Sequence, residues 1–497
     1  MSRPLTPPKT LQRISIFEDF RLKVAGHAVL EHASLSVLPG EVLVIMGPSG
    51  VGKSLLTDAV FSLLETSATV EASDVNPAVA RQGCVVFQHA GGLPHLSVRQ
   101  NLRLVAATPA LADEALHASG LAPNASPERL SGGEKRRLAV QRALATGKPL
   151  LWFDEPAAGL DVHRSETLAK QLRAEAQEHG RAVIVVEHQP AFICAVADRV
   201  VWMLGDGHLQ EVPPEVWADE AILSQHFRDA VQAAPAGSED EGWSRPAFRW
   251  AMLAWPLRPL RWLRSLPYAL LWPLGFFSSG WSLAFRSAGV AWGLTGLRGI
   301  PYFAAVSAIF SLIFLLVFEL AVAFVDPSAV VARMGPQVLL RVAPVLACLL
   351  AAAQAGSSLT AWLGTMQSQR QLDALRVLHA PVERGLIAPT WFGGMLGVLC
   401  SAFVFAAVMA LVFAGYLHWN APEMLDSYVQ ALRALPWMNA LGRTLLFSAV
   451  VASVAVDESL EVRRQSDSVA RAVTASIVWG TIWVIASEAL ILAIELL

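Results

Sequence analysis

The second half of the chain contains five apolar stretches that are long enough to cross a lipid bilayer. They lie at about residues 301–325, 338–362, 387–416, 434–455 and 470–495. Because about 20 helical residues span the hydrocarbon layer, each stretch qualifies as a membrane span. The composition agrees, since the chain is 54% hydrophobic and only 16% charged. We therefore expect an all-α transmembrane domain with five membrane spans.

Length, charge and cysteine usage set further limits. A chain of 497 residues is expected to form two domains, because one hydrophobic core stops growing at about 250–300 residues. The net charge of −3 gives no indication of a nucleic-acid partner. The cysteines Cys84, Cys194, Cys348 and Cys400 fit neither a metal site nor a disulfide framework, so we interpret them as buried thiols. The N-terminus lacks the apolar core of a signal peptide, which predicts that the first domain stays in the cytoplasm.

Residues 1–230 alternate short apolar strands with helical stretches. The apolar runs occur in EVLVIMG, GCVVFQ, PLLWFDEP and RAVIVVEH. Near-continuous runs of Val, Ile and Leu between helices are typical of a parallel sheet that helices cover on both faces. This region is therefore predicted to be an α/β nucleotide-binding domain.

The region that joins the two domains has two segments that differ in composition. Residues 231–245 have no hydrophobic periodicity and are predicted to be a linker. Residues 246–290 interleave arginines with tryptophans, which predicts interfacial helices in the headgroup region, ahead of a transmembrane domain at 291–497. A soluble amphipathic helix docked on the first domain is the alternative. Arginines between spans two and three, and between spans four and five, place these connections on the cytoplasmic side.

A glycine-rich turn follows the strand EVLVIM. Its sequence GPSGVGKS matches the pattern GxxxxGK[ST] and comprises Gly47, Pro48, Ser49, Gly50, Val51, Gly52, Lys53 and Ser54. Backbone N–H groups of such a loop surround the β- and γ-phosphates of a nucleotide. Lys53 supplies positive charge and Ser54 a hydroxyl ligand for Mg²⁺. The loop is therefore predicted to bind a nucleoside triphosphate.

Two adjacent carboxylates end the strand PLLWFDE. Asp154 can hold Mg²⁺ through water, and Glu155 can polarise the water that attacks the γ-phosphate. A solvated strand end is the simpler interpretation of two acids. The phosphate loop upstream favours the catalytic one.

The order of these and further motifs resembles the ATPase of ABC transporters, an α/β P-loop NTPase. The resemblance rests on GPSGVGKS, on Gln88 after GCVVF, on LSGGE at 130–134, on FDEP and AGLD, and on His188 after VIVVE. It implies that ATP is the substrate and that Glu155, His188 and Gln88 are catalytic, with Ser54, Gln88 and Asp154 around Mg²⁺. It also implies that Ser131, Gly132, Gly133 and Asp161 complete the ATP site of a second subunit. LKVAGHAV offers no aromatic residue where the family stacks adenine.

Spans two and three resemble the permease of MlaE-type lipid transporters. The similarity lies in AGSSLTA, QLDAL and the PVERGLIAP connection, and the last span is similar as well. The sequence departs from the family at Val342, Gln354 and Arg370. Gln371, Leu372, Asp373, Leu375 and Arg376 are the candidate coupling helix, expected to rest in a groove of the ATPase near Gln88. An ordinary interfacial helix is the alternative.

Four polar residues of the spans are candidates for a substrate cavity. Gln354, Ser357 and Ser358 lie among small residues of span two, where close helix packing alone is the favoured explanation and lining a cavity between two copies is the alternative. Glu319 lies within span one, and an acid at membrane depth is costly enough to suggest function, unless it reaches the interface.

Together these features predict an ATP-driven transporter of lipid, most simply phospholipid, in the bacterial inner membrane. Because one chain carries one ATPase and one permease, we expect a homodimer with two composite ATP sites. The resemblance also implies a periplasmic lipid carrier with an MCE domain as partner. The alternatives are an ATP-driven mechanical device acting on a periplasmic protein, and an exporter of drugs or peptides.

Overall fold

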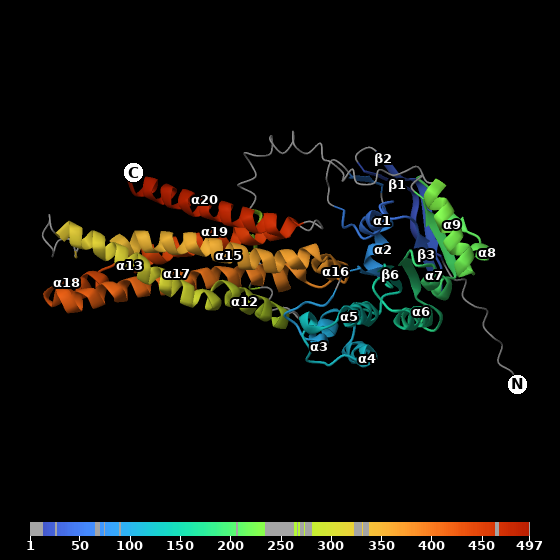
Figure 1. The fold of residues 1–497 in the computed structure, drawn as a ribbon, viewed down its shortest axis with the longest axis horizontal. Helices are drawn as coiled ribbons and strands as arrows, with labels where there is room; N and C mark the ends of the chain where they lie inside the picture. The colour runs from blue at the N-terminus through green and yellow to red at the C-terminus, as the bar shows by residue number, and fades with distance from the viewer. Residues whose placement is uncertain are drawn as a thin grey trace. The chain divides into compact units, whose positions relative to one another are not determined.

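The chain folds into two compact units (Figure 1). The computed structural model describes residues 13–233 and 281–496, with gaps at 25–26, 65–69, 74, 89–90, 205–206, 323–330, 332–336 and 463–466, and a few residues between 263 and 273. The first unit comprises Met1–Pro246 and Arg370–Ala380, and the second comprises Ala247–Gln369 and Pro381–Leu497. Most of the predicted linker and of the expected interfacial segment lies outside the described residues.

The first unit is built around a mainly parallel sheet. Its strand order is β5-β6-β7-β3-β8-β9, and all neighbours pair in parallel except β8 and β9. The strands are β3 (Val42–Met46), β5 (Gly83–Val86), β6 (Leu150–Asp154), β7 (Ala182–Val186), β8 (Arg199–Met203) and β9 (Leu209–Val212). Every residue of β3, β6 and β7 is buried, because both faces of the sheet are covered. The expected α/β fold is confirmed.

Alternate residues of these strands enter two different hydrophobic cores. Ile45 and Trp152 join the core formed with α1 (Lys53–Val60), α2 (Pro77–Gln82) and a second, antiparallel sheet of β1 (Ile14–Val24), β2 (His27–Val37) and β4 (Val70–Ala72). Val44 and Phe153 join the core on the other face, formed with α5 (Gly132–Ala145), α6 (Val162–Gln177) and α7 (Pro190–Val196).

A smaller helical layer adjoins the sheet. It consists of α3 (Val98–Val105) and α4 (Pro109–Ser119), which pack against α5, and of the short η1 (Pro127–Arg129). Val98, Leu116 and Leu138 form its core. Two further helices, α8 (Pro214–Trp217) and α9 (Glu220–Ala233), follow β9.

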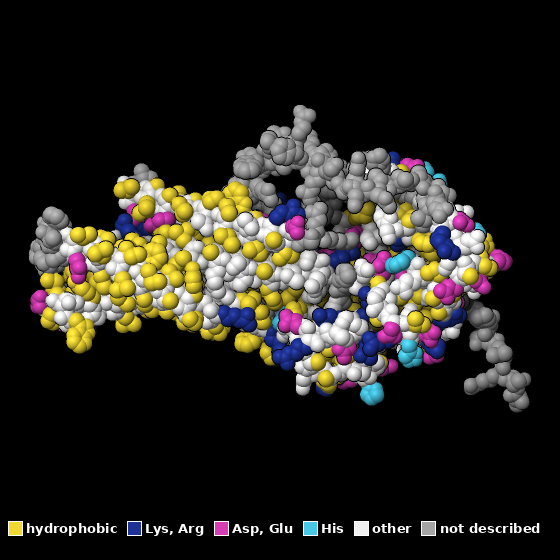
Figure 2. Space-filling view, in the orientation of Figure 1, with side chains coloured by type: hydrophobic (Ala, Val, Ile, Leu, Met, Phe, Trp, Pro, Cys, Tyr) yellow, Lys and Arg dark blue, Asp and Glu magenta, His cyan; other side chains and the backbone are white. Residues whose placement is uncertain are grey.

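The second unit is helical throughout its described residues. Its elements are α12 (Trp281–Thr295), η3 (Leu297–Gly299), α13 (Ile300–Val322), η4 (Val338–Val342), α15 (Ala343–Ser368), η5 (Glu383–Ile387), α17 (Ala388–Asn420), α18 (Pro422–Arg433), α19 (Trp437–Leu460) and α20 (Ser468–Leu496). Five of its helical stretches are long and apolar enough to cross a membrane: Trp281–Leu320, Val338–Ser368, Glu383–Asn420, Trp437–Leu460 and Ser468–Leu496. In Figure 1 these helices lie side by side. Hydrophobic side chains cover most of their visible face in Figure 2. The expected five spans are confirmed.

The first span begins earlier than the apolar stretch at 301–325 suggested. Helix α12 runs almost directly into α13 and packs along α17. Glycines allow this close approach, since a Cβ added at Gly397 would lie 1.9 Å from the Thr295 hydroxyl oxygen, and one at Gly393 would lie 2.1 Å from the Ala288 carbonyl oxygen. Small residues at helix contacts serve the same purpose in membrane proteins generally.

Candidate active site

The glycine-rich loop connects the buried strand β3 to helix α1, as the motif predicts. None of its three glycines can be replaced without strain, and Gly50 has a φ of +82°. A Cβ at Gly47 would lie 2.3 Å from the carbonyl oxygen of Met203, and Gly52 has a φ of +105° in addition to close contact with Val29. The loop therefore brings its backbone closely around the start of α1, where N–H groups are available for an anion.

Lys53 folds back over this loop. Its Nζ donates hydrogen bonds to the carbonyl oxygens of Gly47, at 2.7 Å, and Pro48, at 2.8 Å. Burial lowers the pKa of the Lys53 ammonium, and the nearby carboxylates of Glu155 and Asp154 act in the opposite direction. The side chain is thus placed among the loop carbonyls and the acids at the end of β6.

The three predicted catalytic side chains meet at the Glu155 carboxylate. Gln88 follows β5, Glu155 follows β6 and His188 follows β7. These strands are neighbours and parallel, so their carboxyl ends share one edge of the sheet. Gln88 Nε2 donates a 2.7 Å hydrogen bond to Glu155 Oε2. His188 Nδ1 lies 3.7 Å from Glu155 Oε1.

The main chain at Glu155 is held in an uncommon conformation. Its φ is +48°, in the left-handed region that few side chains other than glycine adopt. The Glu155 N–H donates to the carbonyl oxygen of Val186 at 2.9 Å. Arg136 donates one guanidinium hydrogen bond to the Glu155 carbonyl oxygen and another, of 2.8 Å, to that of Gln88. These bonds fix the direction in which the Glu155 side chain points.

Two supporting residues had no assigned role in the sequence analysis. Arg136 lies in the sequence that follows LSGGE, and burial lowers the pKa of its guanidinium. Glu187 is fully buried and accepts hydrogen bonds from the backbone N–H groups of Ala157, at 3.1 Å, and His188, at 2.8 Å. Glu187 thereby holds in place the backbone just after Glu155 and the backbone at His188. The sequence feature that indicates this role is an acidic residue, Glu187, at the end of an otherwise apolar strand.

The LSGGE segment and Asp161 stand at two helix N-termini. Ser131 caps α5: its Oγ accepts from the Glu134 N–H at 3.4 Å and donates to the Glu134 carboxylate at 2.8 Å. The Ser131 N–H bonded to Glu134 lowers the pKa of that carboxyl group. Asp161 caps α6 by accepting from the Arg164 N–H at 2.9 Å. Ser131, Gly132 and Asp161 are exposed and Gly133 is partly exposed.

Comparison with known proteins agrees with this geometry. The family model for ABC transporters matches residues 30–158, and the model described as Permease MlaE matches residues 292–494. A probable ABC transporter ATP-binding protein, PEB1C of Campylobacter jejuni, is 34% identical over 213 residues, which cover 39% of this chain and 88% of the relative. The chain belongs to the ABC transporter family.

Other relatives and a solved structure extend this comparison. The glutamine transport ATP-binding protein GlnQ of Geobacillus stearothermophilus is 35% identical over 209 residues, covering 38% of this chain and 85% of the relative. A solved dimeric ATP-binding cassette in a post-hydrolysis state with ADP and Pi is 26% identical. The match covers 39% of this chain and 97% of the solved chain, with a TM-score of 0.33. By the family models and these sequence relatives, the first unit is an ABC ATPase, which binds and hydrolyses ATP, and the second carries an MlaE-type permease domain.

In this ABC transporter the candidate coupling helix belongs to the ATPase unit. Helix α16 (Gln371–Val377) lies within Arg370–Ala380, the part of the later sequence that clusters with the first unit. The side chains of Leu372 and Leu375 are fully buried, and Gln371 is nearly so. Asp373 and Arg376 form an ion pair at 3.5 Å on the more exposed side.

The four predicted cavity residues have partners within the permease unit. Gln354 Nε2 donates to the Leu294 carbonyl oxygen at 2.9 Å, and Ser357 and Ser358 donate to the Gln354 carbonyl oxygen at 2.9 and 2.8 Å. Glu319 is exposed and accepts a 2.9 Å hydrogen bond from the Tyr416 hydroxyl. The packing interpretation therefore accounts for the contacts of the span-two residues.

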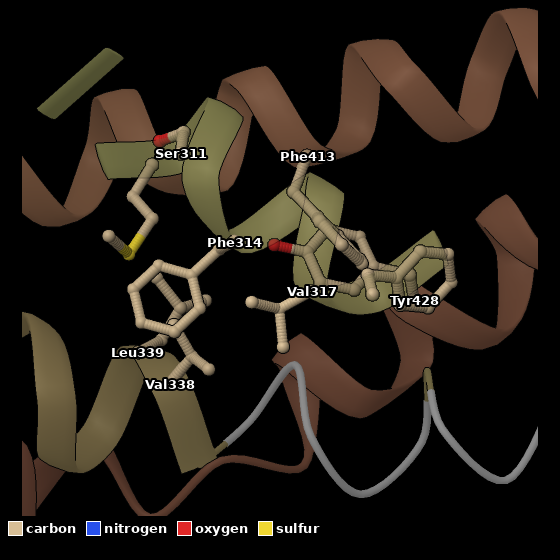
Figure 3. A pocket seen from close by; sticks show the side chains of 9 residues that line it. Ser311, Phe314, Val317, Val338, Leu339, Phe413 and Tyr428 are labelled. Atoms are coloured by element: carbon tan, nitrogen blue, oxygen red, sulfur yellow. The ribbon is translucent and has the colours of Figure 1, made fainter. Parts of the chain in front are cut away.

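A separate apolar pocket lies between other helices of the permease unit. It is small, with a cavity volume of about 40 Å³. Figure 3 shows Phe314 and Val317 of α13 beside Val338 and Leu339 of η4. The full lining is Ser311, Phe314, Val317, Phe318, Val338, Leu339, Met409, Phe413 and Tyr428. The pocket is almost wholly hydrophobic, and Glu319 follows one of its lining residues in sequence.

Proposed function

We propose that two copies of the chain form an ATP-driven transporter of phospholipid or a related lipid in the bacterial inner membrane. The observation that carries this proposal is the match of residues 292–494 to the MlaE permease family, on the same chain as the phosphate-loop, LSGGE and FDEP motifs of an ABC ATPase. We assign residues 1–230 to the ATPase, 231–245 to the linker, 246–290 to interfacial helices and 291–497 to the permease. The apolar spans of the permease, with few fixed charges, favour lipid cargo over a hydrophilic solute.

The proposed hydrolytic roles follow from the strand-end geometry. Glu155 orients and polarises the attacking water, and the Gln88 amide and the His188 imidazole hold the γ-phosphate and water in line with it. Lys53 and the loop N–H groups neutralise the phosphate charge. Catalysis of this kind depends on positioning and charge, so the rigid support of Glu155 by Arg136 serves it directly.

Magnesium ion is the proposed cofactor. Ser54, Gln88 and Asp154 would hold it, because a hydroxyl, an amide oxygen and a carboxylate are the hard oxygen ligands that Mg²⁺ prefers. Asp154 stands at the end of β6 in the immediate electrostatic environment of Lys53, as such a ligand should. When bound, Mg²⁺ would neutralise charge that develops on the phosphates.

The proposed homodimer is supported by the exposure of the LSGGE segment. Ser131, Gly132 and Asp161 lie at helix N-termini open to solvent, where positive helix-dipole ends attract anions. In a head-to-tail pair, the γ-phosphate held by Lys53 of one copy would meet Ser131 and Gly133 of the other. A periplasmic carrier with an MCE domain is the proposed receiving or donating partner.

Two measurements test the proposed cargo. Lipids that copurify with the full-length protein from membranes are identified by mass spectrometry, and fluorescent phospholipid transfer from reconstituted vesicles is followed with MgATP. We expect bound phospholipid above the level found with an unrelated membrane protein, and transfer that requires ATP hydrolysis. Stimulation of hydrolysis by drugs or peptides, with no response to any lipid, would contradict lipid cargo and favour an exporter.

A further inference from the structure

The helix α16 shares the hydrophobic core of the ATPase unit. Ala374 and Val377, which are 3% and 5% exposed, belong to the same buried cluster as Phe61, Phe87 and Trp152. The chain enters this segment after α15, a membrane span, and leaves it toward η5, at the start of the next span. The segment is therefore a covalent part of the permease sequence that folds as part of the ATPase.

An arginine anchors the N-terminal end of α16. Arg370 pairs with the carboxylate of Asp58, and its guanidinium carbon lies 4.0 Å from the centre of the Phe87 ring. The two charged side chains are 12% and 9% exposed. A guanidinium group can pair with a carboxylate and stack on an aromatic ring at the same time, because it is planar and has several N–H donors. Arg370 also has a φ of +58°, so the segment begins with a sharp change of direction.

A lysine anchors the other end. Lys148 Nζ donates hydrogen bonds to the carbonyl oxygens of Val377, at 2.9 Å, and Gly83, at 2.6 Å, and lies 3.1 Å from His379 Nδ1. Burial lowers the pKa of the Lys148 ammonium. The last turn of α16 is thus tied to the first residue of β5, the strand that leads to Gln88.

The partners of Arg370 belong to the two elements that hold the nucleotide candidates. Asp58 lies on α1, the helix that begins at Lys53, and Phe87 directly precedes Gln88. Because a helix moves as a rigid body, a shift of α1 against the Gln88 segment would be felt at the Arg370 guanidinium. We propose that Arg370 is a positioning residue that couples nucleotide state to the permease through Asp58 and Phe87. This inference rests on membership of the ABC transporter family and is independent of the cargo.

Hydrogen–deuterium exchange of the full-length protein in lipid nanodiscs tests this proposal. In a Glu155→Gln background, MgATP is expected to change exchange in ATPase peptides and in permease peptides near 360–369 and 381–390. Adding Arg370→Ala should leave the ATPase response within twofold and reduce the permease response by at least half. Asp58→Asn should have the same effect, because it removes the carboxylate charge that holds the guanidinium.

The controls separate coupling from folding. Arg173→Ala removes a half-exposed pair with Asp198, 3.3 Å apart in the same unit, and should leave both responses unchanged. If Arg370→Ala does not accumulate as a folded protein, Arg370→Lys and Asp58→Asn give the same comparison, since lysine lacks the planar donor group. An undiminished permease response in these variants overturns the proposal. So does loss of the ATPase response together with it, or a permease that ignores MgATP when Arg370 is intact.

Discussion

The side-chain amide of Gln88 donates a 2.7 Å hydrogen bond to the Glu155 carboxylate, joining the ends of strands β5 and β6. Arg136 strengthens this link, because its guanidinium donates hydrogen bonds to the main-chain carbonyl oxygens of both residues. The Glu155 carboxylate, which is the proposed catalytic group, is therefore positioned by the Gln88 segment, which follows the neighbouring strand β5. A movement of the segment around Gln88 would displace the Glu155 side chain or break this hydrogen bond. ATP hydrolysis would therefore respond to whatever contacts the Gln88 segment of the ATPase.

Glu155→Gln is predicted to abolish turnover while ATP binding persists. The amide keeps the shape of the side chain and can still interact with Gln88, but it cannot polarise water as a carboxylate does. Loss of such a group costs about 10²–10⁴ in rate. Phosphate release should fall by this factor, while equilibrium binding of a fluorescent ATP analogue changes less than threefold.

The matched control for this variant is Glu178→Gln, a change of the same type at an exposed position just after α6. It should hydrolyse ATP at the wild-type rate. Turnover of Glu155→Gln within tenfold of wild type would remove Glu155 from the role of general base.

The arrangement of the catalytic candidates could be predicted from the sequence because it depends on local motifs and one topological rule. Gln88, Glu155 and His188 each follow an apolar strand, and the ends of parallel strands meet at one edge of a sheet. Side-chain partners that are distant in sequence could not be predicted this way. Arg370 and Asp58 are 312 positions apart, and no periodicity links them.

The start of the first span shows a different limit of sequence reasoning. Arg286 and Arg298 interrupt the apolar pattern ahead of residue 301, so hydropathy places the span later than the helix begins. The helix extends back to Trp281 because α12 packs closely along α17, where Gly393 and Gly397 allow contact. Such packing is decided by the partner helix, which hydropathy along one segment does not report.

Cys84 is predicted to be an unreactive thiol until the ATPase unfolds. It is fully buried in β5, and burial raises the pKa of its thiol to about 11. At pH 8 roughly one thiol in a thousand would then be ionised, even before access is considered. Maleimide modification, mapped by mass spectrometry, should therefore reach Cys84 at least 100-fold more slowly in native protein than in urea. Cys194, which is only partly buried, is the internal comparison; equal native rates would contradict the burial of β5.

Arg443 is predicted to be essential for the stability of the permease unit. It lies on α19, is 7% exposed, and pairs with Glu488 at 2.6 Å and with Glu495, both on α20. Removing one partner of a buried ion pair leaves an uncompensated charge and costs about 3–5 kcal/mol. Arg443→Met should therefore lower the thermal unfolding temperature in detergent. The double variant Arg443→Met/Glu488→Met should recover most of the loss. A double variant no more stable than the single one would show that the pair is not the cause.

Composite ATP sites predict complementation between two inactive variants. Lys53→Ala removes the charge of the phosphate loop, and Ser131→Arg blocks the LSGGE helix N-terminus with a bulky cation, so each homodimer should lack activity at both sites. A mixed dimer retains one site built from the intact loop of one copy and the intact LSGGE segment of the other. Random pairing makes half of the dimers mixed with one working site each, so coexpression should restore about a quarter of the wild-type hydrolysis rate. Purification through two different tags should raise this to about half, since only mixed dimers remain. If each site were complete within one chain, both proteins would stay inactive when paired, and the mixed sample would show no hydrolysis above that of the separate variants.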